Sequence, residues 1–349
     1  MKLKARDFSV LFAVGVCLFL CVARPCYAEV GAQENFRVGL ELLDDGKPDE
    51  AITQFQLAIK KDPSKAEFYS RLAETYTQKH MWEEAVDAYK KSIKLDPKNA
   101  QLHNNLGVLY DAYSMLNEAV TQYKKAIAID PAHVDAYNNL AVTYLRGGRH
   151  EKAKETLQKA LELDPNHVQA HFNMGITYTR LRFRKKAIEE YRKTIELDPK
   201  YPEAYNNTGI LLEALGEPDE AAEQWKKAIE VAPEHVDGYY NLGAYYFNRE
   251  MYDKVLPLWQ KLVELSPDDP WAHWRLAAAY GRSGDRKKAE EERDICNALL
   301  GKAQEAEKAA EEAAEKAAEE AAGKASVETK EDTAQEATEK EATKTSKGK

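Results

Sequence analysis

Apolar residues recur along most of this chain with the spacing of paired amphipathic helices. In one stretch, Leu106 and Tyr110 share a face of a first helix, and Ala119 and Tyr123 share a face of a second. A short turn around Ser114 separates the two. The pattern predicts a helix-turn-helix unit in which the two apolar faces pack against each other.

The same unit returns every thirty-four residues, which predicts an all-α solenoid that grows by stacking and needs no single central core. A proline closes most units at the same interval: Pro63, Pro97, Pro131, Pro165, Pro199, Pro233 and Pro267. We expect eight units between residues 32 and 300, beginning at Ala32, Ala66, Ala100, Val134, Val168, Pro202, Val236 and Pro270.

Small and polar residues mark the turns and the helix contacts. Glycine occupies the turn in four units, where a residue without a Cβ ends a helix in the left-handed region: Gly46, Gly148, Gly216 and Gly284. Asn117, Asp219 and Asp253 follow such turns and are predicted to cap the second helices. Gly107 and Gly243 belong to a row of glycines and alanines at which a neighbouring helix is expected to pass closely.

These residues resemble the tetratricopeptide repeat family, in which Leu-Gly, Tyr, Ala, an aromatic residue and Pro recur at the intervals seen here. The resemblance covers Ala32 to about Leu300. It implies a right-handed superhelical solenoid of about eight helix-turn-helix units, with the first helices lining the concave face.

One asparagine per unit occupies the same place in five consecutive first helices: Asn105, Asn139, Asn173, Asn207 and Asn241. Arg71 and Arg275 take that place toward the two ends. A carboxamide offers donors and an acceptor together, so it can bind a peptide group whatever the side chain of that residue is. We predict that this row, with Asn104 and Asn138 beside it, binds an extended polypeptide. The alternative is that these side chains only satisfy local backbone or water.

The row resembles the asparagine ladder in the repeats that precede O-linked N-acetylglucosamine transferases, whose groove holds extended polypeptide. The catalytic domain of those enzymes has no counterpart here, so the resemblance implies binding without chemistry. No phosphate-binding loop, His-Glu-x-x-His motif or nucleophile elbow occurs in the sequence. His167 and His171 have helical spacing but are interpreted as turn residues. We therefore predict no enzymatic activity, no cofactor and no metal site.

Two further groups of residues offer contacts to a ligand. Tyr240, Trp274 and Arg275, with Trp271, form an aromatic and cationic cluster typical of binding hot spots, unless the tryptophans only seal the end of the solenoid. A basic patch in an otherwise acidic chain is a candidate site for an anionic partner, unless it is only the charge that exposed turns often carry; it comprises Arg146, Arg180, Arg182, Arg184, Lys185 and Lys186, with Arg149 nearby.

The formal net charge of −9 over 349 residues disfavours nonspecific nucleic-acid binding. Residues 1–28 combine a basic start with a short apolar run and indicate a signal peptide cleaved near Ala28; a retained membrane anchor or a lipidated cysteine is the alternative. Residues 301–349 are rich in Ala, Glu and Lys and are expected to be partly helical and then disordered.

The function predicted from these features is that of an exported, periplasmic scaffold, which binds an extended segment of another protein within an envelope or membrane-associated complex. The alternative is a binder of glycan or another anionic polymer through the asparagines and the basic patch.

Overall fold

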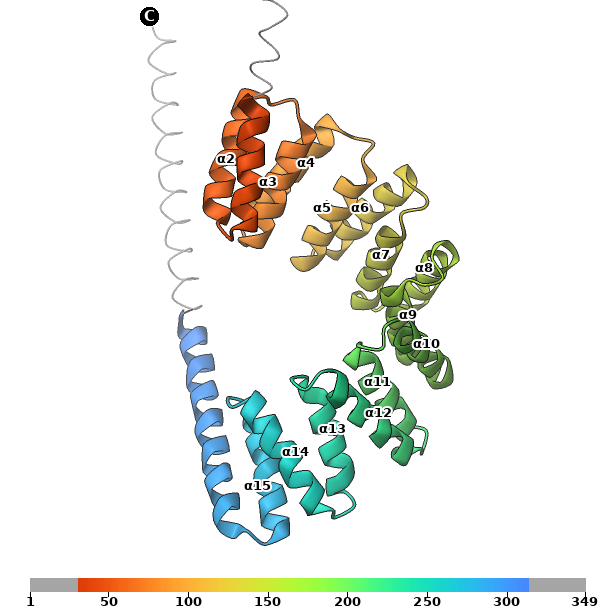
Figure 1. Cartoon of the computed structure of the whole chain (residues 1–349), viewed down its shortest axis with the longest axis vertical. Helices are drawn as coiled ribbons and strands as arrows, with labels where there is room; N and C mark the ends of the chain where they lie inside the picture. Colours follow the sequence, from red (N-terminus) through yellow and green to blue (C-terminus); the bar gives the residue numbers. More distant parts are fainter. Residues whose placement is uncertain (1–30, 314–349) are drawn as a thin grey trace, which may run out of the picture. The chain divides into compact units, whose positions relative to one another are not determined.

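The computed structural model describes residues 31–313 of the chain. The predicted signal peptide at residues 1–28 and the tail beyond residue 313 lie outside that part. Every regular element within it is a helix, and the helices follow one another as antiparallel hairpins (Figure 1). The all-α class and the helix-turn-helix repeat predicted from the sequence are therefore confirmed. The chain divides into two compact units, and the boundary in the sequence falls between Ala204 and Tyr205.

The N-terminal unit contains five hairpins, numbered 1 to 5 in chain order. Hairpin 1 pairs the helix over residues 31–44 with α2 (Pro48–Lys61). The next four are α3 (Ala66–Gln78) with α4 (Trp82–Leu95), α5 (Ala100–Ala112) with α6 (Leu116–Ile129), α7 (Val134–Arg146) with α8 (His150–Leu163), and α9 (Val168–Arg180) with α10 (Arg184–Leu197). Within this unit α2 contacts α3, α4 contacts α5, α6 contacts α7 and α8 contacts α9, so neighbouring hairpins stack in sequence order.

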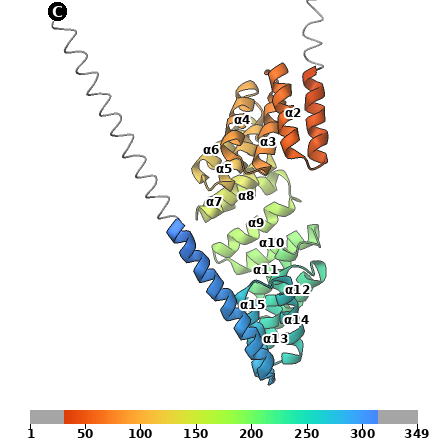
Figure 2. The ribbon, with the colours of Figure 1, turned by 90° about the vertical axis from the view of Figure 1, so that its left-hand side faces the viewer.

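The C-terminal unit continues the series with hairpins 6 to 8. These are α11 (Pro202–Glu213) with α12 (Pro218–Val231), α13 (Val236–Phe247) with α14 (Tyr252–Leu265), and α15 (Pro270–Ser283) with a helix over residues 286–313. The first three residues of α11 belong to the N-terminal unit. Figure 2 shows α13, α14 and α15 packed beside one another.

In five hairpins an aromatic side chain of the second helix fills the centre by lying over a glycine of the first helix. Tyr123 is 2% exposed and lies over Gly107, and Trp259, also 2% exposed, lies over Gly243. Burial raises the pKa of the Tyr123 hydroxyl above its usual range, and the nearby Asp111 carboxylate adds to the shift, so the phenol stays neutral. We expected a neighbouring helix backbone to pass close to the small residues. The close contact is instead made by the aromatic side chain of the second helix in the same hairpin.

The turn between the two helices of a hairpin contains one residue in the left-handed region. Four of these residues are the predicted glycines, and the other four carry side chains at the same thirty-four-residue interval: His80, Ser114, Arg182 and Glu250. The predicted caps were wrong. Asn117 and Asp219 are the second residues of α6 and α12, because the helix begins two residues after the left-handed residue, and neither helix has a side-chain cap.

The turn of hairpin 4 offers a direct test of the left-handed requirement, because two glycines adjoin there. Gly148 has φ +69° and open space where a Cβ would lie, whereas Gly147 has φ −81°. We expect Gly148→Ala to lower the free energy of unfolding by about 1 kcal/mol, since only the backbone conformation opposes the added methyl group. Chemical denaturation measures the change. Gly147→Ala is the matched control and should be nearly neutral; an equal loss in both variants would contradict the assignment.

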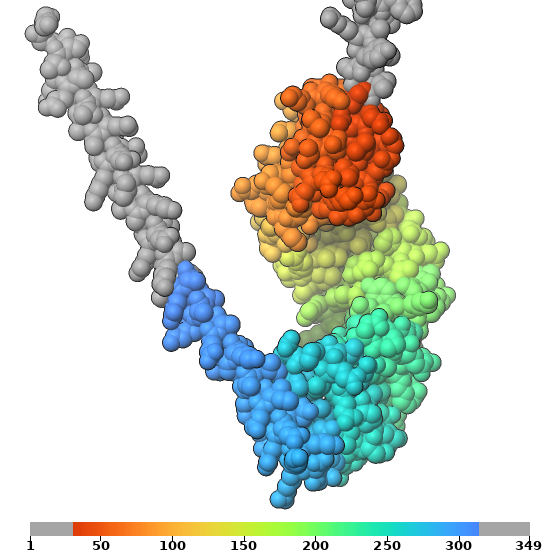
Figure 3. Space-filling model, turned by 60° about the vertical axis from the view of Figure 1, so that its left-hand side comes forward, coloured from red at the N-terminus to blue at the C-terminus, as the bar shows by residue number. Residues whose placement is uncertain are grey.

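The last helix extends beyond the hairpins of the C-terminal unit. Its residues 302–313 are all exposed, and the helix, blue in Figures 1 and 2, continues past α15 as a separate rod in Figure 3. Cys296, nearer its start, is buried. Among residues 31–313, no helix has the length and apolarity that a membrane crossing requires.

Candidate functional site

The predicted asparagines lie at one equivalent position on successive first helices. Asn105, Asn139 and Asn173 come from α5, α7 and α9 of the N-terminal unit, where α5 contacts α7 and α7 contacts α9. Asn207 and Asn241 come from α11 and α13 of the C-terminal unit. Each unit therefore presents its own part of the row on the side formed by first helices, which we call the first-helix face.

Hydrogen bonds link this row to the preceding hairpin with a constant offset of thirty-five residues. Asn139 Nδ2 donates to Asn104 Oδ1 at 3.1 Å, and Asn173 Nδ2 donates to Asn138 Oδ1 at 2.8 Å. In the C-terminal unit Asn241 Nδ2 donates to Asn206 Oδ1 at 2.7 Å. The asparagines thus join neighbouring first helices. The alternative raised by the sequence was that they bond only to local backbone or water.

The asparagines of the N-terminal unit differ in how far they are exposed to solvent. Asn104 and Asn138 are 4% and 6% exposed, and Asn173 is 5% exposed, so their side chains are enclosed between helices. Asn105 and Asn139 are half-buried. The Asn105 side chain accepts from Gln101 at 2.7 Å and donates to Glu74 at 3.5 Å. Asn139 therefore presents the least engaged carboxamide of the three on the N-terminal unit.

An aliphatic row beside the asparagines was missed from the sequence. Val108, Val142 and Ile176 each follow an asparagine by three residues, so they lie on the same side of their helices. Val108 is 45% exposed, and Ile210 is 44% exposed at the equivalent position of the C-terminal unit. The thirty-four-residue recurrence of Val or Ile after four of the five asparagines was the signal that could have identified them.

In the aromatic and cationic cluster of the C-terminal unit, Arg275 and Tyr240 contact each other, whereas Trp271 and Trp274 are exposed. The Arg275 guanidinium donates to the Tyr240 hydroxyl and stacks 3.7 Å from the centroid of that ring, which repeats the thirty-five-residue link with other side chains. Trp271 and Trp274 are 58% and 52% exposed. The two rings pack edge-on against each other at 6.5 Å between centroids, and about half of each side chain is open to solvent. Arg71, at the other end, pairs with Glu74 on its own helix at 2.8 Å.

The predicted basic patch lies at the turns of hairpins 4 and 5. Arg146 is engaged internally, because its guanidinium contacts the Asp111 carboxylate at 2.6 Å and the Ser114 hydroxyl at 3.2 Å. The remaining members are exposed at the end of α9 and the start of α10: Arg180, Arg182, Arg184, Lys185 and Lys186. The structure therefore separates Arg146 from the rest of the patch.

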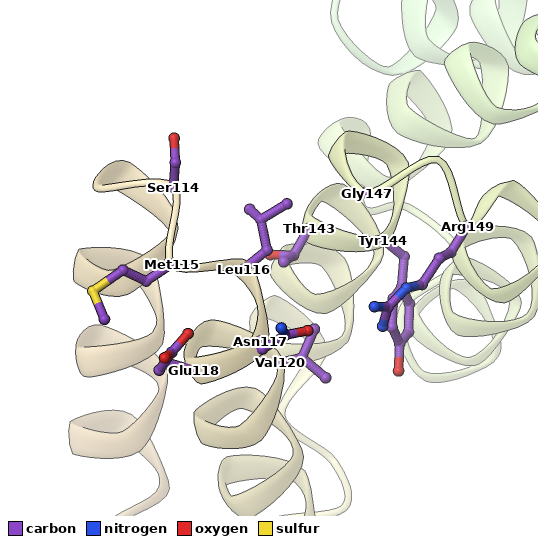
Figure 4. A pocket seen from close by; sticks show the side chains of 10 residues that line it. All are labelled: Ser114, Met115, Leu116, Asn117, Glu118, Val120, Thr143, Tyr144, Gly147 and Arg149. Carbon is purple, nitrogen blue, oxygen red and sulfur yellow. The ribbon is translucent and has the colours of Figure 1, made fainter.

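A pocket of about 340 Å³ opens between the turn of hairpin 3 and the end of α7 (Figure 4). Leu116 and Val120 supply apolar walls, and Glu118 and Arg149 supply opposite charges. The Arg149 guanidinium lies 6.0 Å from the centroid of the Tyr144 ring. This pocket belongs to the edge of the unit that carries the turns, and not to the first-helix face.

The two histidines with helical spacing both have structural contacts. His167 caps α9, because its ring nitrogen accepts from the Ala170 backbone N–H. His171 contacts Glu190 at 2.7 Å and the Pro165 carbonyl at 3.0 Å. Partial burial opposes the charge of His171, but these two hydrogen bonds outweigh it and raise its pKa. Among residues 31–313, no group of three or more His, Cys, Asp or Glu side chains is arranged to hold a metal ion.

Comparison with solved structures finds the same fold in many proteins. The chain is 21% identical to Pseudomonas aeruginosa pilF, over 60% of this chain and 96% of that one, with a TM-score of 0.53. A tetratricopeptide repeat protein from Parabacteroides merdae is 16% identical over 71% and 98% of the two chains, with a TM-score of 0.57. YrrB, described as a repeat protein with an unusual peptide-binding site, is 25% identical over 53% and 96%, with a TM-score of 0.44.

Family models give the same assignment directly from the sequence, whereas no curated protein matches the chain. Models described as tetratricopeptide or TPR repeats match residues 75–112, 112–174, 185–216, 202–235 and 270–294. Together with the stacked helical hairpins and the glycine under an aromatic ring in five of them, these matches place the chain in the tetratricopeptide repeat family.

Proposed function

We propose that the first-helix face of the N-terminal unit binds an extended segment of another protein. Proteins of this family are typically non-catalytic scaffolds that bind other proteins. The observation that carries the proposal is the pairing of two rows on this face: half-buried carboxamides at Asn105 and Asn139, and aliphatic side chains at Val108 and Val142.

The two rows are complementary to different parts of an extended chain. Asn139 uses one N–H to reach Asn104, so its carbonyl oxygen can accept from the N–H groups that an extended backbone presents. Val108 offers apolar surface to alternate side chains of the same segment. Because an exchanged hydrogen bond contributes only about 0.5–1.5 kcal/mol, most of the affinity must come from apolar burial beside the amides.

The N-terminal segment, residues 1–28, indicates where the protein acts. The basic and apolar pattern of residues 1–28 supports export, and we propose that the scaffold acts in the cell envelope as part of a protein complex. The second candidate, a binder of glycan or another anionic polymer, draws its support from the exposed cations at the turn of hairpin 5.

Site-specific photo-crosslinking in the producing cells tests the proposal and separates the two candidates. A photoreactive amino acid replaces Val108, which is 45% exposed on α5. The expected adduct is one defined protein, crosslinked through a single short segment that mass spectrometry of the digest identifies. The matched control carries the same amino acid at Thr121, which is exposed on α6.

The two positions belong to the same hairpin, but Val108 lies on its first helix and Thr121 on its second. They therefore compare the two sides of one hairpin. An adduct at Val108 and none at Thr121 supports the first-helix face. Carbohydrate adducts at Val108, or identical protein adducts from both positions, would reject it.

A further inference from the structure

The turn of hairpin 5 concentrates positive charge in an acidic protein. Residues 177–188 carry five basic side chains and no acidic one, while the whole chain has a formal net charge of −9. The five are Arg180, Arg182, Arg184, Lys185 and Lys186, and all are exposed. We call them the hairpin 5 cations.

None of the hairpin 5 cations forms an ion pair within the described residues. Hairpin 8 has a similar basic turn, yet there Lys288 pairs with Asp285 at 3.6 Å and Lys287 pairs with Glu291 at 3.7 Å. The charge of hairpin 5 therefore remains available to an external anion, whereas the charge of hairpin 8 is partly neutralised from within.

The position of these charges opposes the stability of their own helix. Helix N-termini favour acidic residues because the aligned peptide dipoles place partial positive charge there. The second helices of hairpins 1 to 4 follow this preference in their first turns, with Asp49 and Glu50, Glu83 and Glu84, Glu118, and Glu151. Only α10 of this unit begins Arg184-Lys185-Lys186 with no acidic residue in its first turn. Local stability does not explain the exception.

An exposed aromatic ring lies among the hairpin 5 cations. Phe183 is 49% exposed, and its ring is packed edge-on against Tyr178 at 6.2 Å between centroids. The Lys186 ammonium lies 5.7 Å from the centroid of Phe183 and 5.6 Å from that of Tyr178. These contacts hold the ring at the centre of the charges, where a partner can bury it.

We propose that the turn of hairpin 5 binds an acidic segment of a partner protein, with an apolar side chain of that segment packed on Phe183. Charge complementarity selects the partner: unpaired cations favour carboxylates, and the exposed ring favours a neighbouring apolar residue. The segment is short because the five cations all lie between Arg180 and Lys186, so a few acidic residues on either side of one apolar residue are enough to meet them.

This contact is independent of the first-helix face, because the residues of the turn come from the end of α9 and the start of α10. A second docking point would raise the effective concentration of a partner already held by the face. The acidic peptide probe tests the turn alone, so a failure there is distinguishable from a failure of the first-helix face.

Binding of a synthetic peptide to the full chain tests the inference. The probe is a fluorescein-labelled peptide of Asp and Glu residues around one central tryptophan, measured by fluorescence anisotropy at low and high ionic strength. The test variant is Arg180→Glu, Arg182→Glu and Lys185→Glu combined. Folding should tolerate it, because Glu250 occupies the left-handed position equivalent to Arg182, and an acid at Lys185 restores the usual first turn.

The control variant, Arg282→Glu, Arg286→Glu and Lys287→Glu, makes the same charge change at hairpin 8. We expect the hairpin 5 variant to bind the peptide about tenfold more weakly than the wild type, which corresponds to three exposed charge pairs, and the control to change less than about twofold. Phe183→Ser should weaken binding at both ionic strengths, because it removes an apolar contact that salt does not screen.

Three results would overturn the inference. The first is equal binding by the wild type and the hairpin 5 variant, and the second is an equal loss in the control. The third is binding of phosphatidylglycerol vesicles or of heparin by the wild type with no binding of the peptide, which would assign the cations to a lipid surface or a polymer.

Discussion

Gly243→Ala is expected to lower the free energy of unfolding of the C-terminal unit by about 1–3 kcal/mol. A Cβ at this position would lie 2.0 Å from Nε1 of Trp259, whose ring is 2% exposed and cannot swing into solvent. Overpacking of that kind forces a side chain off its rotamer or moves the helices apart. The cost outweighs the gain of about 0.5–1 kcal/mol that alanine brings to a helix interior.

The chain itself suggests the compensating change. Hairpin 4 has Ala141 and Leu157 where hairpin 7 has Gly243 and Trp259, so alanine is accommodated beneath a smaller side chain. In a Trp259→Leu background, Gly243→Ala should lower the free energy of unfolding by clearly less than it does beneath tryptophan. A double-mutant cycle, followed by urea denaturation, measures the difference. Gly281→Ala is the control, since the nearest atom to its Cβ is 3.8 Å away and the change should be neutral or stabilising. Additive losses in the cycle would refute the contact.

Asn173→Ala is expected to lower the free energy of unfolding of the N-terminal unit by about 1–3 kcal/mol. The substitution removes the 2.8 Å hydrogen bond to Asn138 and leaves the Asn138 carbonyl without that donor in a site that is 6% exposed. A buried acceptor without a partner costs its full desolvation penalty, which exceeds the net value of the bond itself. Stacking of hairpins 4 and 5 depends on this pair.

A double-mutant cycle with Asn138→Ala isolates the pairwise contribution. Removing both partners should cost less than the sum of the single changes, because no buried acceptor is then left alone. Asn117→Ala, at an exposed position of α6, should change stability by less than about 0.5 kcal/mol. If Asn173→Ala matched this control, the asparagine would not link the hairpins.

The repeat was predictable because its signals are local. Apolar spacing within each helix and the proline at each thirty-four-residue step depend on neighbours along the chain, and α5, α7 and α9 begin at Ala100, Val134 and Val168 accordingly. The caps were mispredicted because the left-handed residue of the turn sets where the second helix begins, which is two residues after it. The helix then begins before Asn117 or Asp219 is reached.

The role of the asparagines was less predictable because it depends on contacts between hairpins. The bond from Asn139 to Asn104 spans thirty-five residues, one more than the repeat, and it forms only when two first helices lie side by side. Carboxamides suited to a ligand are equally suited to each other. Val108 was overlooked for a related reason, since an aliphatic residue at helical spacing indicates core until its 45% exposure is known.

Binding of an extended polypeptide on the first-helix face of the N-terminal unit can be measured directly. The most direct measurement is the dissociation constant of the crosslinked segment, made as a synthetic peptide, for Val108→Glu and for Thr121→Glu, two variants with the same added charge on opposite helices of hairpin 3. We expect binding to be weaker by about tenfold or more for Val108→Glu and close to wild type for Thr121→Glu. Unchanged binding by Val108→Glu would contradict it.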